Sequence, residues 1–206
     1  MTDDQCQWVA LPFFLQIDKE KLKYQDALIY LTIRSFRNSS SGDCFPSYET
    51  IGLKANVSRN FVRASVKRLK LSGLIDSTAS KAAWNKNNSH RYSFEKIYGF
   101  DQIPESFFNI SDLSYSEKSM LLCVRVFFVQ GWLTTSCSMK EMAHWIGITY
   151  KTLYSQFIKL LDKGYIEEVI KYERKRYVLT SKVSWITGQK KPNQIKNKVK
   201  GRLLVC

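Results

Sequence analysis

The chain repeats its own pattern of residue types, and this repeat limits the possible folds more than any single motif does. The segment LKYQDALIYLTIRSF (22–36) aligns with LSYSEKSMLLCVRVF (113–127), and the alignment continues without a gap to Ile75 and Ile166. Identity is low, but apolar, small and hydroxyl residues coincide along the whole length. A duplicated unit of about 90 residues is the simplest explanation, because repeated architectures show self-similarity at a fixed offset.

Each copy is predicted to contain three helices. The first covers about Tyr24–Phe36 in one copy and Ser116–Val129 in the other, where apolar residues recur at helical spacing. A polar loop follows each of these helices. The second helix then begins after Ser47 or Ser138, because a serine hydroxyl can accept a hydrogen bond from the first turn.

A tight turn is predicted between the second and third helices. Asn56 in the first copy aligns with Gly147 in the second, and these residue types best tolerate a left-handed backbone. An apolar residue and a hydroxyl N-cap follow, Ser58 and Thr149 respectively. The third helix ends at a glycine in each copy, which suits a helix C-terminus. The pattern is typical of a helix-turn-helix.

A β-hairpin is predicted after each third helix. Its strands cover Leu74–Ser77 and His90–Phe94 in the first copy, and Tyr165–Ile170 and Arg176–Thr180 in the second. A helix-turn-helix followed by a hairpin is a winged helix. The predicted fold class is therefore α+β, mainly α, with two tandem winged-helix domains related by internal duplication.

The repeat also sets the predicted domain boundaries. They are 12–96 for the first winged helix, 97–112 for a junction, 113–181 for the second winged helix, and 182–206 for a basic C-terminal tail. The junction is rich in aromatic residues, which predicts a packed connection. If the two third helices lie along one face, they would occupy grooves about one helical turn (~34 Å) apart.

The net charge of +14, from 32 basic and 18 acidic residues, favours a polyanionic partner. No apolar run approaches the roughly 20 residues that span a bilayer, so a membrane partner is not expected. The N-terminus begins with acidic residues, which is unlike a signal peptide, so we expect a cytoplasmic protein. The five cysteines are irregularly spaced and predict neither disulfides nor a zinc site.

The segment FPSYETIGLKANVSRNFVRASVKRLKLSGLI (45–75) resembles the winged helix-turn-helix modules of bacterial, phage and plasmid DNA-binding proteins. Two such modules in one short chain are similar in layout to plasmid replication initiators. The resemblance implies that the third helix enters the major groove of double-stranded DNA, with its N-terminal half at the base edges. It also implies that the hairpin wings contact the backbone or the minor groove.

The resemblance assigns candidate DNA-binding residues to both copies. In the first copy they are the N-cap Ser58 and the residues Arg59, Asn60, Arg63 and Lys67, with Phe61 among them for a thymine methyl group. In the second copy they are Tyr150, Lys151, Thr152, Tyr154 and Lys159. This set contains no arginine, whose guanidinium group can donate two hydrogen bonds to one base. We therefore expect the second copy to discriminate less between DNA sequences, or to contact mainly phosphates.

Further candidates lie on the wings and at the start of the second helices. The wing candidates are Lys86, His90 and Arg91 in the first copy, and Arg174, Lys175 and Arg176 in the second. Ser47 and Ser138 are candidates for holding a phosphate through helix N-terminal amides.

For several further arginine and lysine residues, the sequence also indicates a structural role. Arg68 and Lys70 lie late in the third helix, where they can stabilise the helix dipole or contact DNA. Arg34 and Arg125 occupy equivalent places in apolar helices, which favours structural pairing, or snorkelling of the charged group to the surface, for both. No nucleophile–base pair, phosphate-binding glycine loop or metal-ligand cluster is visible in the sequence, so no enzyme, metal or cofactor is expected.

The predicted function is sequence-specific binding of double-stranded DNA, as a plasmid or phage replication initiator that binds origin repeats through two recognition helices. A transcription regulator of a mobile element is one alternative. The other is a winged-helix scaffold that binds replication or transcription proteins. A homodimer is left open by the sequence.

Overall fold

The computed structural model describes residues 8–12, 22–79, 90–96, 100–129, 132–133, 138–171 and 174–183. Over these ranges the fold mixes helices with small antiparallel sheets, and about half of it is helical. Within the same ranges, no helix combines the length and the apolar content that crossing a membrane requires.

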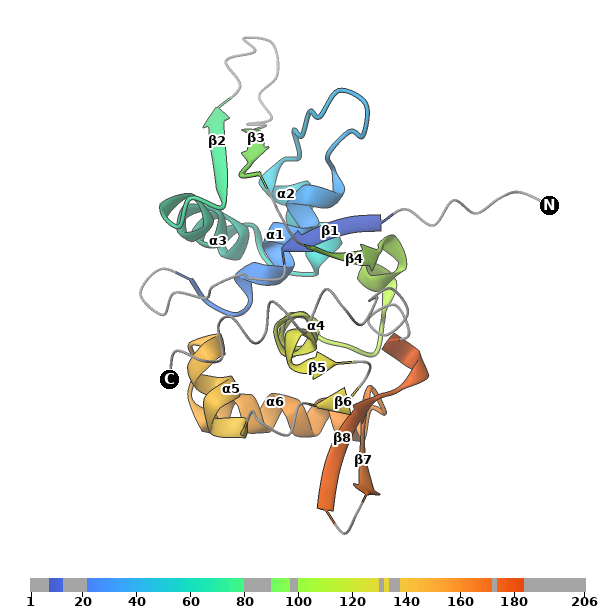
Figure 1. Cartoon of the computed structure of the whole chain (residues 1–206). Coiled ribbons are helices and arrows are strands. Elements are labelled where there is room, and N and C mark those ends of the chain that lie inside the picture. Colours follow the sequence, from blue (N-terminus) through green and yellow to red (C-terminus); the bar gives the residue numbers. More distant parts are fainter. Residues whose placement is uncertain are drawn as a thin grey trace, which may run out of the picture.

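The first unit contains three helices and a hairpin: α1 (Asp26–Ser35), α2 (Tyr48–Ala55), α3 (Arg59–Leu71), β2 (Ile75–Ala79) and β3 (His90–Phe94). The helix α1 packs on both α2 and α3, and α2 packs on α3. The hairpin of β2 and β3 projects from this helical group (Figure 1).

The second unit shows the same order of three helices and a hairpin: α4 (Tyr115–Val124), α5 (Met139–Ile146), α6 (Tyr150–Asp162), β7 (Ile166–Lys171) and β8 (Arg174–Leu179). Two short strands, β5 (Phe128–Val129) and β6 (Trp132–Leu133), extend its sheet to the order β5-β6-β8-β7. The two hairpins lie at opposite ends of the molecule, with α1 and α4 between them (Figure 1).

The first helix of the second unit is shorter than the sequence predicts. The structure ends α4 at Val124, and a 3₁₀ turn over Arg125–Phe127 leads into β5 instead of continuing the helix to Val129. Aromatic and β-branched residues such as those at this end suit a strand, and Phe128 pairs with Leu133 of β6. Sheet pairing therefore replaces the last helical turn.

The predicted turns and caps are present in both units. Asn56 and Gly147 both adopt the left-handed conformation, with φ of 54° and 73°. The hydroxyl of Ser58 accepts a hydrogen bond from the Phe61 amide at 3.2 Å, and the Thr149 hydroxyl accepts one from the Thr152 amide at 3.2 Å. α3 and α6 therefore begin with the same turn conformation and the same kind of N-cap.

The predicted apolar faces of the helix-turn-helix segments are buried or partly buried against one core. They comprise Ile51, Ala55, Val57, Val62, Val66 and Leu69 in the first unit, and Met142, Ile146, Ile148, Leu153, Phe157 and Leu160 in the second. Only Val57 and Ile148, at the turns, are partly exposed.

Substituting Asn56 tests the turn between α2 and α3. Asn56→Val is expected to lower the free energy of unfolding by about 1–2 kcal/mol, because a β-branched side chain is strained at positive φ. Asn56→Gly is expected to leave stability unchanged or slightly higher, since Gly147 fills this position in the second unit. Urea unfolding of both variants measures the difference, and equal midpoints for the two would contradict the assignment.

A strand that the sequence did not reveal joins the N-terminal segment to the junction. β1 (Trp8–Pro12) pairs antiparallel with β4 (Phe100–Pro104), with Val9 opposite Ile103. A 3₁₀ turn over Glu105–Asn109 follows β4 and buries Phe107. The aromatic junction is packed, as predicted, but it is packed as half of a two-stranded sheet that begins before residue 12.

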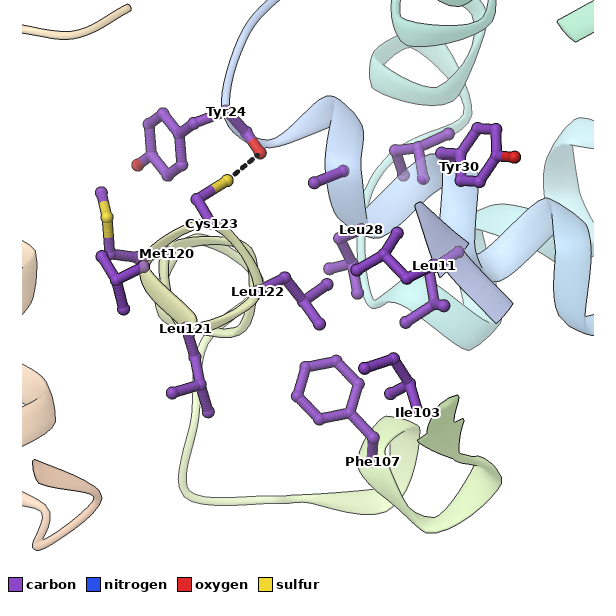
Figure 2. Close-up of a cluster of buried hydrophobic side chains, with 14 of the residues drawn as sticks. Leu11, Tyr24, Leu28, Tyr30, Ile103, Phe107, Met120, Leu121, Leu122 and Cys123 are labelled. Carbon is purple, nitrogen blue, oxygen red and sulfur yellow. Dashed lines mark hydrogen bonds between the residues drawn. The ribbon is translucent and has the colours of Figure 1, made fainter. Parts of the chain in front are cut away.

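The two units share a continuous core where α1 meets α4. Figure 2 shows Leu28 of α1 and Leu122 of α4 on either side of this contact, with Leu11, Ile103 and Phe107 closing it. The Cys123 thiol donates a hydrogen bond to the carbonyl oxygen of Tyr24 across the same contact (3.6 Å). Apolar burial between the units therefore fixes their first helices against each other.

The buried Arg125 ties the N-terminal sheet to α4. Its Nε donates to Asp101 of β4 at 2.8 Å, and its Nη2 donates to the Pro12 carbonyl at 2.8 Å. Its counterpart Arg34 donates to the Tyr30 hydroxyl at 3.0 Å and lies over the Phe94 ring. The structural pairing predicted for both arginines is confirmed.

Candidate nucleic-acid interface

The helix α3 presents a line of basic and polar side chains to solvent. Arg59, Asn60, Arg63 and Lys67 are all exposed. Positions four residues apart share one helix face, so the three basic residues lie in a row. An Arg59 nitrogen is 3.7 Å from the Glu49 carboxylate, but both side chains are more than half exposed. Such a contact is weak in water and can be exchanged for a DNA contact.

The opposite face of α3 is fixed to α1 through the buried Asp26. Arg68 donates two hydrogen bonds to the Asp26 carboxylate, both at 2.7 Å, and the Ser65 hydroxyl donates a third. The Lys23 amide donates a fourth at 2.8 Å. Arg68 is therefore a structural residue. The sequence alone had left open whether it stabilises the helix dipole or contacts DNA. Its role is to hold α3 in place on the unit.

Phe61 does not stand among the exposed side chains of α3. Its ring is half-buried and meets the ring of Tyr115 edge to face, with centroids 5.5 Å apart. The contact of Phe61 with a thymine methyl group stays a prediction, and the packing of its ring on Tyr115 counts against it. The ring is held between α3 and the start of α4, where it connects the two units.

The first wing is held against α2 by aromatic contacts. His90 of β3 stacks on Tyr48 at the start of α2, with ring centroids 4.6 Å apart and planes 16° apart. Burial lowers the pKa of His90, and the nearby charge of Lys70 lowers it further, so His90 is neutral at pH 7. Next to it, exposed Arg91 pairs with Asp43 at 3.1 Å. These contacts set the wing's base beside the α2 N-terminus.

The starts of α2 and α5 differ in their capping contacts, although each first turn contains one glutamate, Glu49 and Glu141 respectively. The Ser47 hydroxyl accepts from the Thr50 amide at 3.0 Å and lies 2.8 Å from the Thr50 hydroxyl, so a hydroxyl stands in α2 where Glu141 stands in α5. In contrast, Ser138 forms a capping box, in which its amide donates to the Glu141 carboxylate at 2.6 Å. Hydrogen bonds from the Ser138 amide and hydroxyl lower the pKa of Glu141 and keep it charged.

The role of Ser138 in holding a DNA phosphate stays a prediction, and the Glu141 carboxylate counts against it. This carboxylate already accepts from the Ser138 amide, and its negative charge would repel a phosphate at the same helix end. In the first unit, the binding of a DNA phosphate at Ser47 stays a prediction.

The exposed face of α6 is aromatic where that of α3 is basic. Tyr150 and Tyr154 are 46% and 48% exposed, and their rings stack with centroids 5.8 Å apart and planes 19° apart. Lys151 and Lys159 are exposed on the same helix. Thr152 is half-buried, and its hydroxyl lies 2.9 Å from that of the N-cap Thr149.

Of the remaining wing candidates, the structure describes only the side chain of Arg176. Lys86 and the side chains of Arg174 and Lys175 lie outside the described part of the chain. Arg176 lies on β8 opposite Val169 and is half-buried. Its Nε is buried without a hydrogen-bond partner among the described residues.

Sequence reasoning missed three residues that shape this surface. The Glu141 cap was readable, because Ser138 and Glu141 have the spacing of a capping box. The anchor Asp26 and the stacking residue Tyr48 carried no such signal. Their partners lie about 40 residues further along the chain and meet them only through tertiary packing.

Residues 20–75 match a family model described as a helix-turn-helix domain. The match covers α1, α2, α3 and the first residue of β2. Comparisons with curated proteins and with solved structures give no match. The first unit therefore contains a helix-turn-helix domain, and DNA is the partner that such a domain implies.

Proposed function

We propose that this chain binds double-stranded DNA in a sequence-specific manner, with α3 as its main reading helix. The observation that carries the proposal is the row of Arg59, Arg63 and Lys67 beside Asn60, on the helix that follows the turn. Arginine can donate two hydrogen bonds to guanine, and asparagine can pair with adenine in the same bidentate way. The helix is anchored behind this row by Asp26, so its donors are held in place before DNA arrives.

The second unit is proposed to be a second winged helix that arose by duplication. Support comes from the matching order of elements, from the left-handed turns at Asn56 and Gly147, and from the N-caps Ser58 and Thr149. The shared core of α1 and α4 holds both units as one body. Because α6 has fewer forked donors than α3, it is expected to contribute less to sequence discrimination.

The proposed biological role is initiation of replication on a plasmid or phage, in the cytoplasm, by binding origin repeats. Two linked reading units and a net charge of +14 suit a protein that holds one segment of DNA along its length. The role is one of binding, without catalysis by this chain.

Selection from a randomised duplex pool at several salt concentrations tests the proposal. Enrichment of one motif by the wild type, absent with Arg59→Ala/Arg63→Ala, is the expected result. Affinity should also fall steeply with salt, because bound phosphates release counterions. Repeats of the selected motif in the DNA around the gene would indicate an origin, and a single copy before a promoter would indicate a transcription regulator.

Two outcomes would contradict sequence-specific binding. Uniform, salt-sensitive binding that the double variant leaves unchanged would mean that the basic surface holds phosphates only. Absence of DNA binding at low salt would favour the protein scaffold.

A further inference from the structure

The exposed face of α6 differs from that of α3 at the very positions that read bases in the first unit. Counted from the N-caps Ser58 and Thr149, the first and fifth residues are Arg59 and Arg63 in α3. In α6 they are Tyr150 and Tyr154. The two forked donors are thus replaced by two aromatic rings that lie against each other.

A second difference concerns the helix before the turn. A helix-turn-helix docked in a groove sets this helix across the phosphate backbone. In the first unit its start is capped by Ser47 and Thr50, whereas in the second unit the carboxylate of Glu141 occupies the equivalent place. In the second unit, therefore, a carboxylate caps the second helix and the third helix, α6, contains no arginine.

We propose that the α6 face binds an unpaired strand of DNA by stacking bases on Tyr150 and Tyr154. In a duplex the faces of the bases are covered by their neighbours, and only base edges are open in the grooves. A ring face can stack on a base only when that base is unpaired or unstacked. Both tyrosines are nearly half exposed, which leaves side-chain surface accessible for contact with such a base.

The charges around the rings suit a nucleic-acid strand as the occupant. Lys151 follows Tyr150 directly and is exposed, while Lys159 lies further along α6 and about half a turn round the helix from Tyr150. A positive charge next to aromatic rings is the combination that single-strand binding surfaces use, with the rings for the bases and the charge for the phosphates. This activity goes beyond duplex binding by α3 and does not depend on it.

Fluorescence anisotropy with one labelled 20-nucleotide strand, alone and annealed to its complement, tests the proposal on the full chain. Tyr150→Leu/Tyr154→Leu removes the rings and keeps apolar bulk. It is expected to weaken single-strand binding about tenfold or more, because each stacked base contributes substantially. Tyr150→Phe/Tyr154→Phe keeps the rings and is expected to bind the strand like the wild type.

Three results would overturn the proposal. They are an unchanged single-strand affinity in the leucine variant, an equal loss in the phenylalanine variant, and an equal loss on the duplex. An equal loss in the phenylalanine variant would assign the effect to the tyrosine hydroxyl groups, and an equal loss on the duplex would assign the tyrosines to contacts that do not need an unpaired strand. An unchanged single-strand affinity in the leucine variant would instead favour a protein partner for the aromatic face of α6.

Photocrosslinking of the wild type to an iododeoxyuridine-substituted strand gives a readout independent of variant folding. Crosslinks are expected in the tryptic peptides 141–151 and 152–159, which contain Tyr150 and Tyr154, and crosslinks confined to α3 would contradict the proposal. Arg59→Ala/Arg63→Ala separates the two proposals. It should lose sequence-specific duplex binding while it keeps single-strand binding, so either function can fail without the other.

Discussion

The double variant Arg59→Ala/Arg63→Ala is expected to bind the selected duplex about 100-fold or more weakly than the wild type. Each bidentate arginine–guanine contact contributes about 1–3 kcal/mol of discrimination, and about 1.4 kcal/mol corresponds to a factor of ten. The substitutions should not disturb the fold, because both side chains are exposed. Titration of the specific duplex and of an unrelated duplex at one salt concentration measures the effect.

The matched control is Lys23→Ala/Arg37→Ala, which removes two exposed positive charges from outside α3. It is expected to weaken specific and unrelated duplexes alike and by much less, since it changes only the general attraction to phosphate. If the control and the α3 variant lost the same affinity on both duplexes, the assignment of base reading to Arg59 and Arg63 would be wrong.

The variant Asp26→Ala is expected to lower the free energy of unfolding by about 3–5 kcal/mol. Removal of one partner from a buried ion pair leaves the other charge desolvated without compensation. Here the loss falls on Arg68, which directs both of its described hydrogen bonds to Asp26, and on the buried Ser65. A change of this size is a large part of the stability of a typical domain. Urea unfolding followed by circular dichroism measures it.

The exposed acidic residue Asp76 supplies the control for Asp26. Its carboxylate lies 3.7 Å from Lys70 at the surface, so Asp76→Ala is expected to cost less than about 1 kcal/mol. A second check is Arg68→Met in the Asp26→Ala background, which should cost far less than Arg68→Met alone because the pair is already broken. Additive losses would show that the two side chains stabilise the protein independently.

Local features of this protein were predictable because they depend on neighbours in the chain. The positive φ at Asn56 and Gly147 follows from residue type, and the caps at Ser58 and Thr149 follow from a hydroxyl before an amphipathic helix. The burial of the periodic apolar residues follows from helical spacing. Each of these signals is complete within one or two helical turns.

Features that depend on distant partners escaped prediction. Trp8–Pro12 became a strand because Phe100–Pro104 offers a pairing edge, about 90 residues away in the chain. Phe61 packs on Tyr115 of the other unit, which lies about 50 residues further along the chain. The predicted helix through Val129 gave way to β5, which pairs with β6, and β6 in turn pairs with β8 about 45 residues further along the chain.

The sequence by itself determined which residues form the exposed basic row of α3 and which tyrosines replace its arginines in α6. Spacing from the N-caps at Ser58 and Thr149 decides which side chains share a face. Only the tertiary structure decided what those faces rest on: Asp26 behind α3, and the core between α1 and α4 that joins the two units. The physical reason is that helix periodicity is a property of adjacent peptide groups, whereas a buried ion pair or a shared core exists only after chain segments far apart in sequence have excluded water together.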